Sequence, residues 1–422
     1  MKLEIGFGAA SQTVELPDKN VVGILESNEV ELFGKGVSLV VESLQSPIGT
    51  PRLSKMVRPG EKVVIITSDI TRPLPGHKLI PAILDELERA GVKPEDVTVV
   101  FALGIHRKHT PEEMKGLVGE SVYNRVRCVD SDPDDFVHMG TTGAGTPVDI
   151  TRIVAEANRR IGLGNIEYHY FAGYSGGAKA IMPGVSTWAA IQSNHSRMVL
   201  PGTAAGRLAG NPVREDIEEA LRFCPLDFIV NVVLDEHKEI ICAVAGEAIQ
   251  AHRKGCEFVD RLYRKDIGMR ADIVVASQGG APKDRDLYQT QKALDNARYA
   301  VKKGGIIILV GSCKEGLGEE VFKEWMTKSK TPGAIIARIQ RNFQLGGHKA
   351  AAIAMVLEDA DIYLVSEMEA TFVEKIFLKP FATVQAALDA AFKKLGHNAT
   401  VLVMPYAGST LPVVTLPTDA GH

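Results

Sequence analysis

The segment KVVIITSDITRPLPGHKLIPAILDELERAGVKPEDVTVVFALG, from Lys62 to Gly104, decides the fold class. Residues 63–67 and 97–102 are short, almost wholly apolar runs, which are typical of strands buried on both faces of a sheet. Between them, residues 77–91 place apolar side chains at helical spacing and end on a glycine. A strand, a helix and a second strand in this order predict a parallel sheet that is covered by helices.

The alternation of strands and helices continues on either side of this segment. Residues 110–119 predict a helix, because Thr110 is followed three residues later by Glu113 in the pattern of a capping box. After a long helix predicted at residues 247–266, apolar runs restart the same rhythm. We expect an α/β protein of two three-layer domains with mainly parallel sheets and an active site in the cleft between them. The expected boundaries are 1–266 for the N-terminal domain, 267–408 for a smaller C-terminal domain and 409–422 for a tail.

The composition argues against several classes of partner. The 422 residues carry a formal net charge of −4, which disfavours a nucleic acid held by a basic face. No apolar run reaches the roughly 18 residues that a membrane-spanning helix needs. The five cysteines form no CxxC pair, which indicates buried thiols in a reducing compartment. The sequence therefore predicts a cytoplasmic protein that binds neither nucleic acid nor membrane.

Polar side chains follow the predicted strands at their carboxyl ends. Asp69 and Arg72 come just after the first strand of the opening segment, and His106 comes just after the second. A third predicted strand, within residues 159–170, leads into His169. Because parallel sheets bind ligands beyond the carboxyl ends of their strands, we expect these four side chains to share one site.

His106 and His169 are candidates for proton transfer, because imidazole titrates close to neutral pH. A single loop histidine is often only a hydrogen-bonded structural residue, but two at neighbouring strand ends favour an acid/base pair. Arg72 could hold a carboxylate through a bidentate contact. A capping or ion-paired role would explain Arg72 equally well.

The segment HYFAGYSGGAKAIMPGVSTWAAIQSNHS, His169–Ser196, combines many glycines with little charge. Gly176 and Gly177 allow the backbone to approach a ligand closely. Lys179 directly after them could be a phosphate clamp, a nucleophile or a covalent tether, with a solvated surface lysine as the plain alternative. His195, near the end of a short predicted helix, could bind a metal, but no partner ligand accompanies it at a metal-binding spacing.

The second half of the chain repeats the order of strand, glycines and helix. Gly279 and Gly280 follow an apolar run, so the amides that open the next helix could bind an anion. Gln289 and Lys292 then project from one helix face, which an ordinary helix surface would explain as well. We interpret the later Gly-Gly-His-Lys element at 346–349 as structural or domain-lining.

Taken in order, these motifs resemble the nickel-dependent lactate racemases and their relatives, which racemise or epimerise 2-hydroxy acids. The resemblance covers nearly the whole chain, and the order and spacing of the motifs make it specific. The motifs are D-x-T-R-P at Asp69–Pro73, G-x-H-R at Gly104–Arg107, H-x-F-A-G-Y-S-G-G-x-K with P-G at His169–Gly184, N-H-S at Asn194–Ser196, and G-G-x-P-x-D with L-Y-Q-x-x-K at Gly279–Lys292.

The resemblance implies a nickel-pincer nucleotide, a pyridinium mononucleotide whose two sulfur-containing arms and one ring carbon hold nickel. It implies that Lys179 tethers this cofactor and that His195 is the protein ligand of the nickel ion. The further implied assignments are His106 and His169 as acid/base residues, Arg72, Tyr288, Gln289 and Lys292 as substrate-binding residues, and Asp69, Gly176 and Gly177 as cofactor-binding residues.

The implied reaction is racemisation of lactate or a related 2-hydroxycarboxylate by reversible hydride transfer through a 2-keto acid. A hydride acceptor avoids a carbanion next to a carboxylate that is already negative. The implied partners are a small 2-hydroxy acid and the enzymes that make the cofactor. One alternative is an NAD-dependent 2-hydroxyacid dehydrogenase, whose GxGxxG motif the pair Gly6 and Gly8 does not complete. The other is a non-catalytic cofactor-binding homologue.

Overall fold

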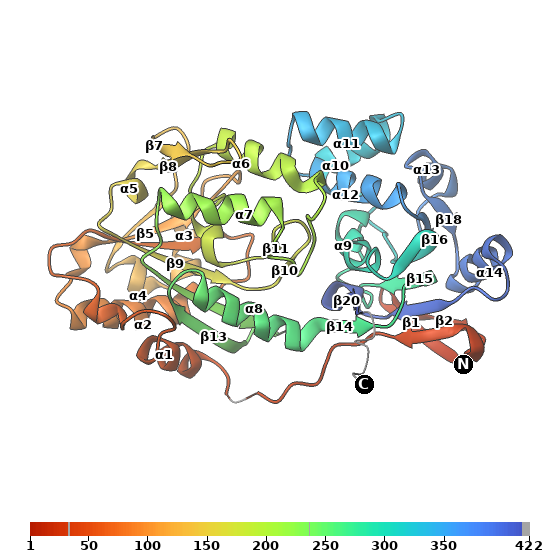
Figure 1. Cartoon of the computed structure of the whole chain (residues 1–422), viewed down its shortest axis with the longest axis horizontal. Helices are drawn as coiled ribbons and strands as arrows, with labels where there is room; N and C mark the ends of the chain where they lie inside the picture. Colours follow the sequence, from red (N-terminus) through yellow and green to blue (C-terminus); the bar gives the residue numbers. More distant parts are fainter. Residues whose placement is uncertain (33, 236, 416–422) are drawn as a thin grey trace, which may run out of the picture. The chain divides into compact units, whose positions relative to one another are not determined.

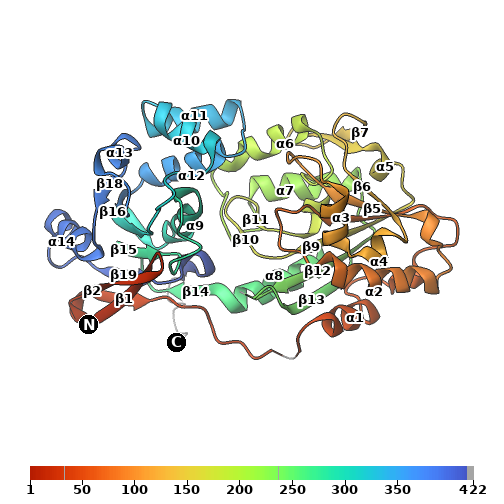
Figure 2. The same cartoon turned by 180° about the vertical axis from the view of Figure 1, so that it is seen from behind.

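The computed structural model describes residues 1–32, 34–235 and 237–415. The chain divides into two compact units. The middle unit comprises residues 30–261, and the terminal unit combines residues 1–29 with residues 262–422. Each unit is built on a six-stranded, mainly parallel sheet with helices packed against it (Figures 1 and 2). The predicted α/β class is therefore confirmed.

The sheet of the middle unit has the strand order β13-β12-β9-β4-β5-β6. Its neighbouring strands run parallel except β12 and β13, which form an antiparallel pair. The strands are β4 (Val63–Ser68), β5 (Val97–Ala102), β6 (Arg127–Asp130), β9 (Arg159–Asn165), β12 (Phe228–Leu234) and β13 (Ile240–Gly246).

Alternate residues of these strands bury apolar side chains against helices. Val63 and Ile65 of β4 pack in one core with Val40 of α1 and Leu79 of α2. The helix predicted after Thr110 is α3, and the predicted capping box is present. The helices of this unit are α1 (Val37–Gln45), α2 (Gly76–Arg89), α3 (Pro111–Val118), α4 (Glu120–Tyr123), α5 (Arg152–Ala155), α6 (Trp188–His195), α7 (Pro212–Glu219) and α8 (Gln250–Tyr263).

Several short strands escaped the sequence analysis. They are too short or too polar to show the period of two that marks a half-buried strand. The segment at Arg264–Ile267, which we expected to be helical, is also a strand, β14, so the long predicted helix ends earlier as α8. The short strands are β7 (Phe136–Thr141), β8 (Pro147–Thr151), β10 (Tyr168–His169) and β11 (Gly173–Tyr174).

The sheet of the terminal unit has the order β18-β17-β16-β15-β19-β3, and all its neighbours are parallel. A hairpin of β1 and β2 packs on the same core, and β20 pairs with β14. The strands are β1 (Lys2–Phe7), β2 (Ala10–Glu15), β3 (Val21–Ile24), β14 (Arg264–Ile267), β15 (Ala271–Ser277), β16 (Val301–Val310), β17 (Asp361–Val365), β18 (Lys379–Phe381), β19 (Val401–Met404) and β20 (Leu411–Val414).

Helices of the terminal unit pack on both faces of this sheet. α14 contributes to the core that holds Ile273 and Ile306, and α9 packs on both β15 and β16. The Gly-Gly-His-Lys element opens α12, whose alanine-rich sequence has no polar face to reveal a helical period. The helices are α9 (Leu287–Ala297), α10 (Glu320–Lys328), α11 (Pro332–Arg341), α12 (Gly347–Leu357), α13 (Ala370–Lys375) and α14 (Val384–Leu395).

The expected N-terminal domain of residues 1–266 is wrong for its first 29 residues. They belong with the C-terminal part of the chain, because β3 pairs with β19 and the side chain of Ile5 packs in the terminal unit's core. The expected tail at 409–422 begins with β20, while its residues 416–422 lie outside the described part. Among the described residues, no helix combines the length and the apolar character needed to cross a bilayer.

Candidate functional site

Three strand ends bring predicted site residues to one edge of the middle unit's sheet. β9, β4 and β5 are neighbours and run parallel, so their carboxyl ends share this edge. Asp69 directly follows β4, His106 lies in the loop after β5, and His169 is in β10, just after β9. The predicted convergence of the three loops is confirmed by this strand order.

Asp69 and His106 form a contact pair across two of these loops. Oδ2 of the buried Asp69 carboxylate lies 2.5 Å from Nδ1 of the half-exposed His106 ring. The other oxygen, Oδ1, accepts a hydrogen bond of 2.7 Å from the Thr71 hydroxyl. The carboxylate therefore fixes the His106 ring with a proton on Nδ1, which leaves Nε2 as the nitrogen that can exchange a proton with a substrate.

Burial and neighbouring donors act in opposite directions on the pKa of Asp69. Burial raises it, but the hydrogen bonds from His106 and Thr71 and the charge of Arg72 outweigh burial and bring it below the ordinary value. Arg72 itself is exposed, and its charge also acts on Lys179. Arg72 thus links the Asp69–His106 pair electrostatically to the glycine-rich segment.

The ring of Phe171 brings three predicted site residues together. Its centroid lies 4.4 Å from that of His169 and 4.9 Å from that of His195, both edge to face. Nζ of Lys179 lies 5.6 Å from the same centroid. The sequence analysis did not single out Phe171, although it lies within the H-x-F-A-G motif. One buried aromatic ring therefore connects the predicted tether, metal ligand and acid/base residue.

The amine of Lys179 sits in an environment that disfavours its charge. Desolvation lowers its pKa well below the ordinary value, and the positive charges of Arg72 and Arg214 lower it further, while Glu167 opposes them. A desolvated lysine amine loses its proton more readily than a solvated one, and the neutral amine is the form that attacks an electrophilic carbon. Lys179 is therefore not a fully solvated surface lysine.

Glycines shape the turn that carries Lys179. Gly176 and Gly177 have φ angles of 75° and 58°, in the left-handed region that favours glycine. A Cβ on Gly177 would lie 2.8 Å from the His252 ring, and one on Gly176 would lie 2.8 Å from Oδ1 of Asn231. That same Oδ1 accepts the Gly177 amide proton at 2.8 Å. Both glycines thus allow the backbone to pass close to other groups of the protein, here the side chains of His252 and Asn231.

A buried cluster that the sequence analysis missed supports this turn from behind. His252 donates a hydrogen bond from Nε2 to the Ser175 carbonyl at 2.8 Å, and its Nδ1 accepts one from Arg214 at 2.9 Å. Glu218 binds the guanidinium of Arg214. Only the tertiary structure reveals this cluster, because its members come from α7 and α8 and match no motif.

The orientation of His195 is set by its sequence neighbour. Nδ1 of His195 lies 2.9 Å from Oδ1 of Asn194, whose amide nitrogen donates to Oδ2 of Asp216 at 2.7 Å. The Asn194 oxygen can only accept, so Nδ1 carries the ring proton and Nε2 carries the lone pair. Among the described residues there is no group of three or more metal-ligating side chains.

Tyr288, Gln289 and Lys292 all lie on α9 of the terminal unit. The amide of Gln289 donates to the N-cap residue Asp286 at 2.8 Å, and those of Leu287 and Tyr288 donate to backbone carbonyls, so protein groups take up the amides that we expected to bind an anion. That expectation is wrong for this helix end. Nζ of Lys349 donates to the Tyr288 carbonyl at 2.5 Å and lies 3.8 Å from the centroid of its ring.

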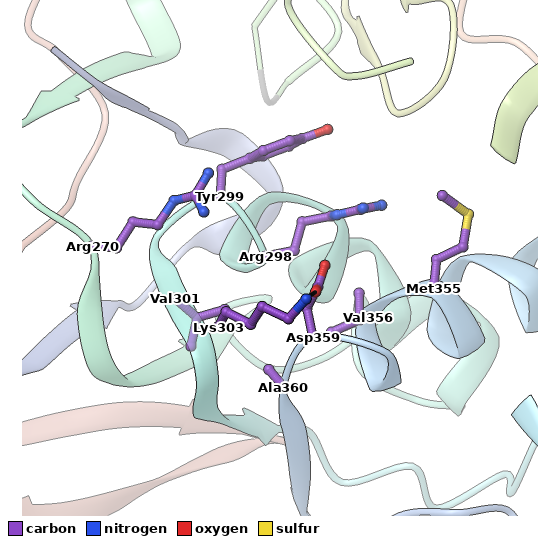
Figure 3. A pocket seen from close by; sticks show the side chains of 9 residues that line it. All are labelled: Arg270, Arg298, Tyr299, Val301, Lys303, Met355, Val356, Asp359 and Ala360. Carbon is purple, nitrogen blue, oxygen red and sulfur yellow. Dashed lines mark ion pairs between the residues drawn. The ribbon is translucent and has the colours of Figure 1, made fainter. Parts of the chain in front are cut away.

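A cavity of about 230 Å³ in the terminal unit holds none of the predicted residues. It lies where β15 and β16 begin, at the sheet edge opposite the carboxyl ends of these strands (Figure 3). Its lining combines basic groups with apolar ones, namely Arg270, Arg298, Tyr299, Val301, Lys303, Met355, Val356, Asp359 and Ala360.

Known proteins match the chain over nearly its whole length. The family model of the lactate racemase N-terminal domain matches residues 7–206, and that of the lactate racemase C-terminal domain matches residues 267–411. A lactate racemase of Thermoanaerobacterium thermosaccharolyticum is 33% identical over 415 residues, which are 96% of this chain and 97% of that protein. A lactate racemase of Lactiplantibacillus plantarum is 31% identical with the same coverage of both chains.

Solved structures agree with these matches. The lactate racemase apoprotein of Thermoanaerobacterium thermosaccharolyticum superposes with a TM-score of 0.85 at 32% identity, and the match covers 98% of this chain and 100% of that one. A Thermotoga maritima protein shares the fold at a TM-score of 0.62 and 18% identity, over 91% of this chain and 100% of that one. The chain therefore belongs to the lactate racemase family and is an isomerase of the racemase type.

Proposed function

We propose that this enzyme interconverts the enantiomers of lactate or a closely related 2-hydroxy acid. The observation that carries the proposal is the Phe171 cluster, in which two imidazoles and a lysine amine whose pKa is lowered by desolvation lie around one ring. The Asp69–His106 pair at the same sheet edge supplies a third imidazole with a defined ring proton. Family membership supports lactate as the first substrate to test.

The residues fit a tethered nickel-pincer nucleotide. Lys179 offers an amine whose pKa is lowered by desolvation for a covalent bond, and His195 carries the lone pair of its neutral ring on Nε2. One imidazole is too few ligands for a metal held by protein alone, so the remaining ligands would come from the nucleotide. When bound, this cofactor supplies the acceptor and donor for the hydride that leaves and returns at Cα, so the substrate passes through the 2-keto acid. We further propose that cofactor-synthesising enzymes mature the chain.

The chain's own residues handle the proton of the substrate hydroxyl. His106 accepts it at Nε2, and the Asp69 carboxylate stabilises the imidazolium that forms. His169 is assigned to the hydroxyl of the opposite enantiomer. Its Nδ1 accepts a hydrogen bond of 3.3 Å from the Ala172 amide, so the proton of the neutral ring lies on Nε2, from which it can be donated to the substrate oxygen. The positive charge of Arg72 holds the substrate carboxylate, and Gln289 and Lys292 are assigned to the same task.

The test is a panel of enantiopure 2-hydroxy acids incubated with enzyme that was co-expressed with the cofactor-making enzymes. Chiral chromatography should show that either lactate enantiomer yields the racemate. His106→Ala and His169→Ala should each lower kcat by about 10²- to 10⁴-fold, the usual contribution of a general base. Intact mass should still show the adduct in both variants, and the exposed His77→Ala should match wild type.

Two further variants separate the tether from the metal. Lys179→Ala should lack the adduct, whereas His195→Ala should keep it and lose nickel, as measured by elemental analysis. An adduct-bearing wild type that interconverts no 2-hydroxy acid would overturn the proposed reaction. An adduct on a peptide other than that of Lys179 would overturn the tether.

A further inference from the structure

His109 and Asp130 form a buried pair beside the proposed site that the mechanism above does not use. The side chain of His109 is only 1% exposed and that of Asp130 only 8%. Nδ1 of His109 lies 2.6 Å from Oδ1 of Asp130, and the His109 amide donates to Oδ2 at 2.9 Å. The ring of Phe101 lies against the imidazole, 5.1 Å from centroid to centroid.

The opposite nitrogen of this imidazole contacts the loop that carries Asp69. The backbone amide of Ile70 donates to Nε2 of His109 at 3.1 Å. An amide nitrogen can only donate, so Nε2 is the acceptor and the ring proton lies on Nδ1, facing Asp130. His109 is thus a neutral imidazole that bridges the carboxyl end of β6 and the loop after β4, the two strands on either side of β5.

The position of Ile70 makes this contact relevant to the Asp69–His106 pair. Ile70 lies between Asp69 and Thr71, and both of these side chains take part in holding the His106 ring. The turn is otherwise closed by short-range bonds, such as that from the Thr71 amide to Oδ1 of Asp69. These bonds shape the turn itself. The Asp69–His106 contact joins its side chain to the loop after β5, and the bond to His109 joins its backbone to the same loop.

We propose that His109, oriented by Asp130, is a positioning residue that holds the Asp69 turn against His106 through the Ile70 amide. This imidazole satisfies a carboxylate on one side and a backbone donor of the proposed site on the other. The effect of the His109–Ile70 contact on turnover rests on the proposed function, whereas the contact itself does not.

Two substitutions separate the halves of the bridge. In His109→Asn, the amide nitrogen stands where Nδ1 stands, so the bond to Asp130 is kept and the bond to Ile70 is lost. In His109→Gln, the longer side chain brings its amide oxygen to the place of Nε2, where it can accept from Ile70. Lys108→Ala is the matched control, because the Lys108 side chain is exposed and makes a 3.7 Å surface contact with Asp132.

Two readouts apply to these variants. Hydrogen exchange of the Ile70 amide, measured on unloaded protein, should become about tenfold faster in His109→Asn, the effect of one lost hydrogen bond. In the loaded enzyme the same variant should lose at least about tenfold in kcat with KM changed less than about twofold, because a displaced catalytic pair slows the chemical step. His109→Gln should restore most of the Ile70 protection from exchange and most of kcat. Lys108→Ala should match wild type in both measurements.

The outcomes are distinguishable. Wild-type exchange or wild-type kcat in His109→Asn would overturn the inference, as would a His109→Gln enzyme as slow as His109→Asn. A wild-type enzyme that turns over no 2-hydroxy acid would overturn the proposed function instead. The exchange of Ile70 would then still decide whether the contact exists.

Discussion

At the scale of single residues, Asp69 shows how one carboxylate can serve both structure and chemistry. Its two oxygens are divided between Thr71 and His106, and these donors keep its pKa below the ordinary value despite burial. The carboxylate therefore loses its proton more readily than an ordinary aspartate does. It can orient the imidazole and also stabilise its charged form.

Asp69→Asn should separate these two effects. The amide can still contact the ring, but it carries no charge to stabilise an imidazolium, so we expect kcat to fall by about two orders of magnitude or more. The depressed pKa also means that the wild-type carboxylate stabilises the fold above its unfolded pKa and loses this contribution as pH falls through the folded value. Rate measurements on loaded enzyme and acid unfolding of both proteins provide the check. An unchanged kcat would contradict the assigned role.

The sequence identified the residue types of the site but not their contacts. His106 and His169 follow predicted strands, and motif order placed Lys179 and His195. The ring of Phe171, the buried His109 and the Arg214–His252 pair remained hidden, because an aromatic, a histidine or an arginine in isolation is compatible with many environments. Their roles depend on partners that are distant in sequence.

At the scale of elements, α9 combines a capped start with a buried carboxylate near its end. Asp286 caps its first turn, and Asp295 is buried in its last turn. Burial raises the pKa of Asp295 to about 7, against the charges of Lys349, Arg298 and Lys292 and the hydrogen bond from Gln291. The side chain of Asp295 is buried within the fold of the terminal unit. Binding of a proton by this carboxylate therefore changes the stability of that unit.

The pKa of Asp295 predicts a pH dependence of stability with a definite sign. Between about pH 4, where the unfolded carboxyl ionises, and about pH 7, the folded state binds more protons, so the free energy of unfolding falls as pH rises. The slope for one proton is at most about 1.4 kcal/mol per pH unit. Asp295→Asn should remove this component. Urea unfolding followed by the fluorescence of the buried Trp325, in a Trp188→Phe background, measures it.

A matched control lies on α14. Gln385 donates to Asp389 across one helical turn, as Gln291 does to Asp295, but the pair on α14 is exposed. Asp389→Asn should therefore leave the pH slope unchanged. Equal slopes for wild type and Asp295→Asn would show that the buried carboxylate does not titrate in this range.

At the scale of the whole molecule, the two ends of the chain build one unit. β3 is the edge strand beside β19, and the β1–β2 hairpin buries Ile5, Val14 and Leu16 in the terminal unit's core. The sequence analysis placed residues 1–29 with the residues that follow them, whereas they belong with residues 262–422. Apolar alternation shows that a strand has a buried face, yet it does not show which sheet accepts it.

Ile5→Ala tests this assignment. Removing a side chain that is 1% exposed should lower the stability of the terminal unit by about 2–5 kcal/mol, the usual cost for a buried isoleucine. Hydrogen exchange resolved by peptide should accelerate in β15 and β16 and stay unchanged in β4 and β5. Val22→Ala, at a side chain that is 42% exposed on β3, is the control. Faster exchange confined to β4 and β5 would place residues 1–29 with the middle unit.

The sequence by itself determined the α/β class, the capping box of α3, the strands whose ends carry Asp69 and His106, and the family motifs. These features depend on the periodicity of neighbouring residues and on short local patterns. Only the tertiary structure decided the partner of β3, the bridge from His109 to Ile70 and the convergence of Lys179, His169 and His195 on one ring. These contacts join residues from separate loops and elements, and their energy depends on burial and geometry that exist only once the sheets have formed.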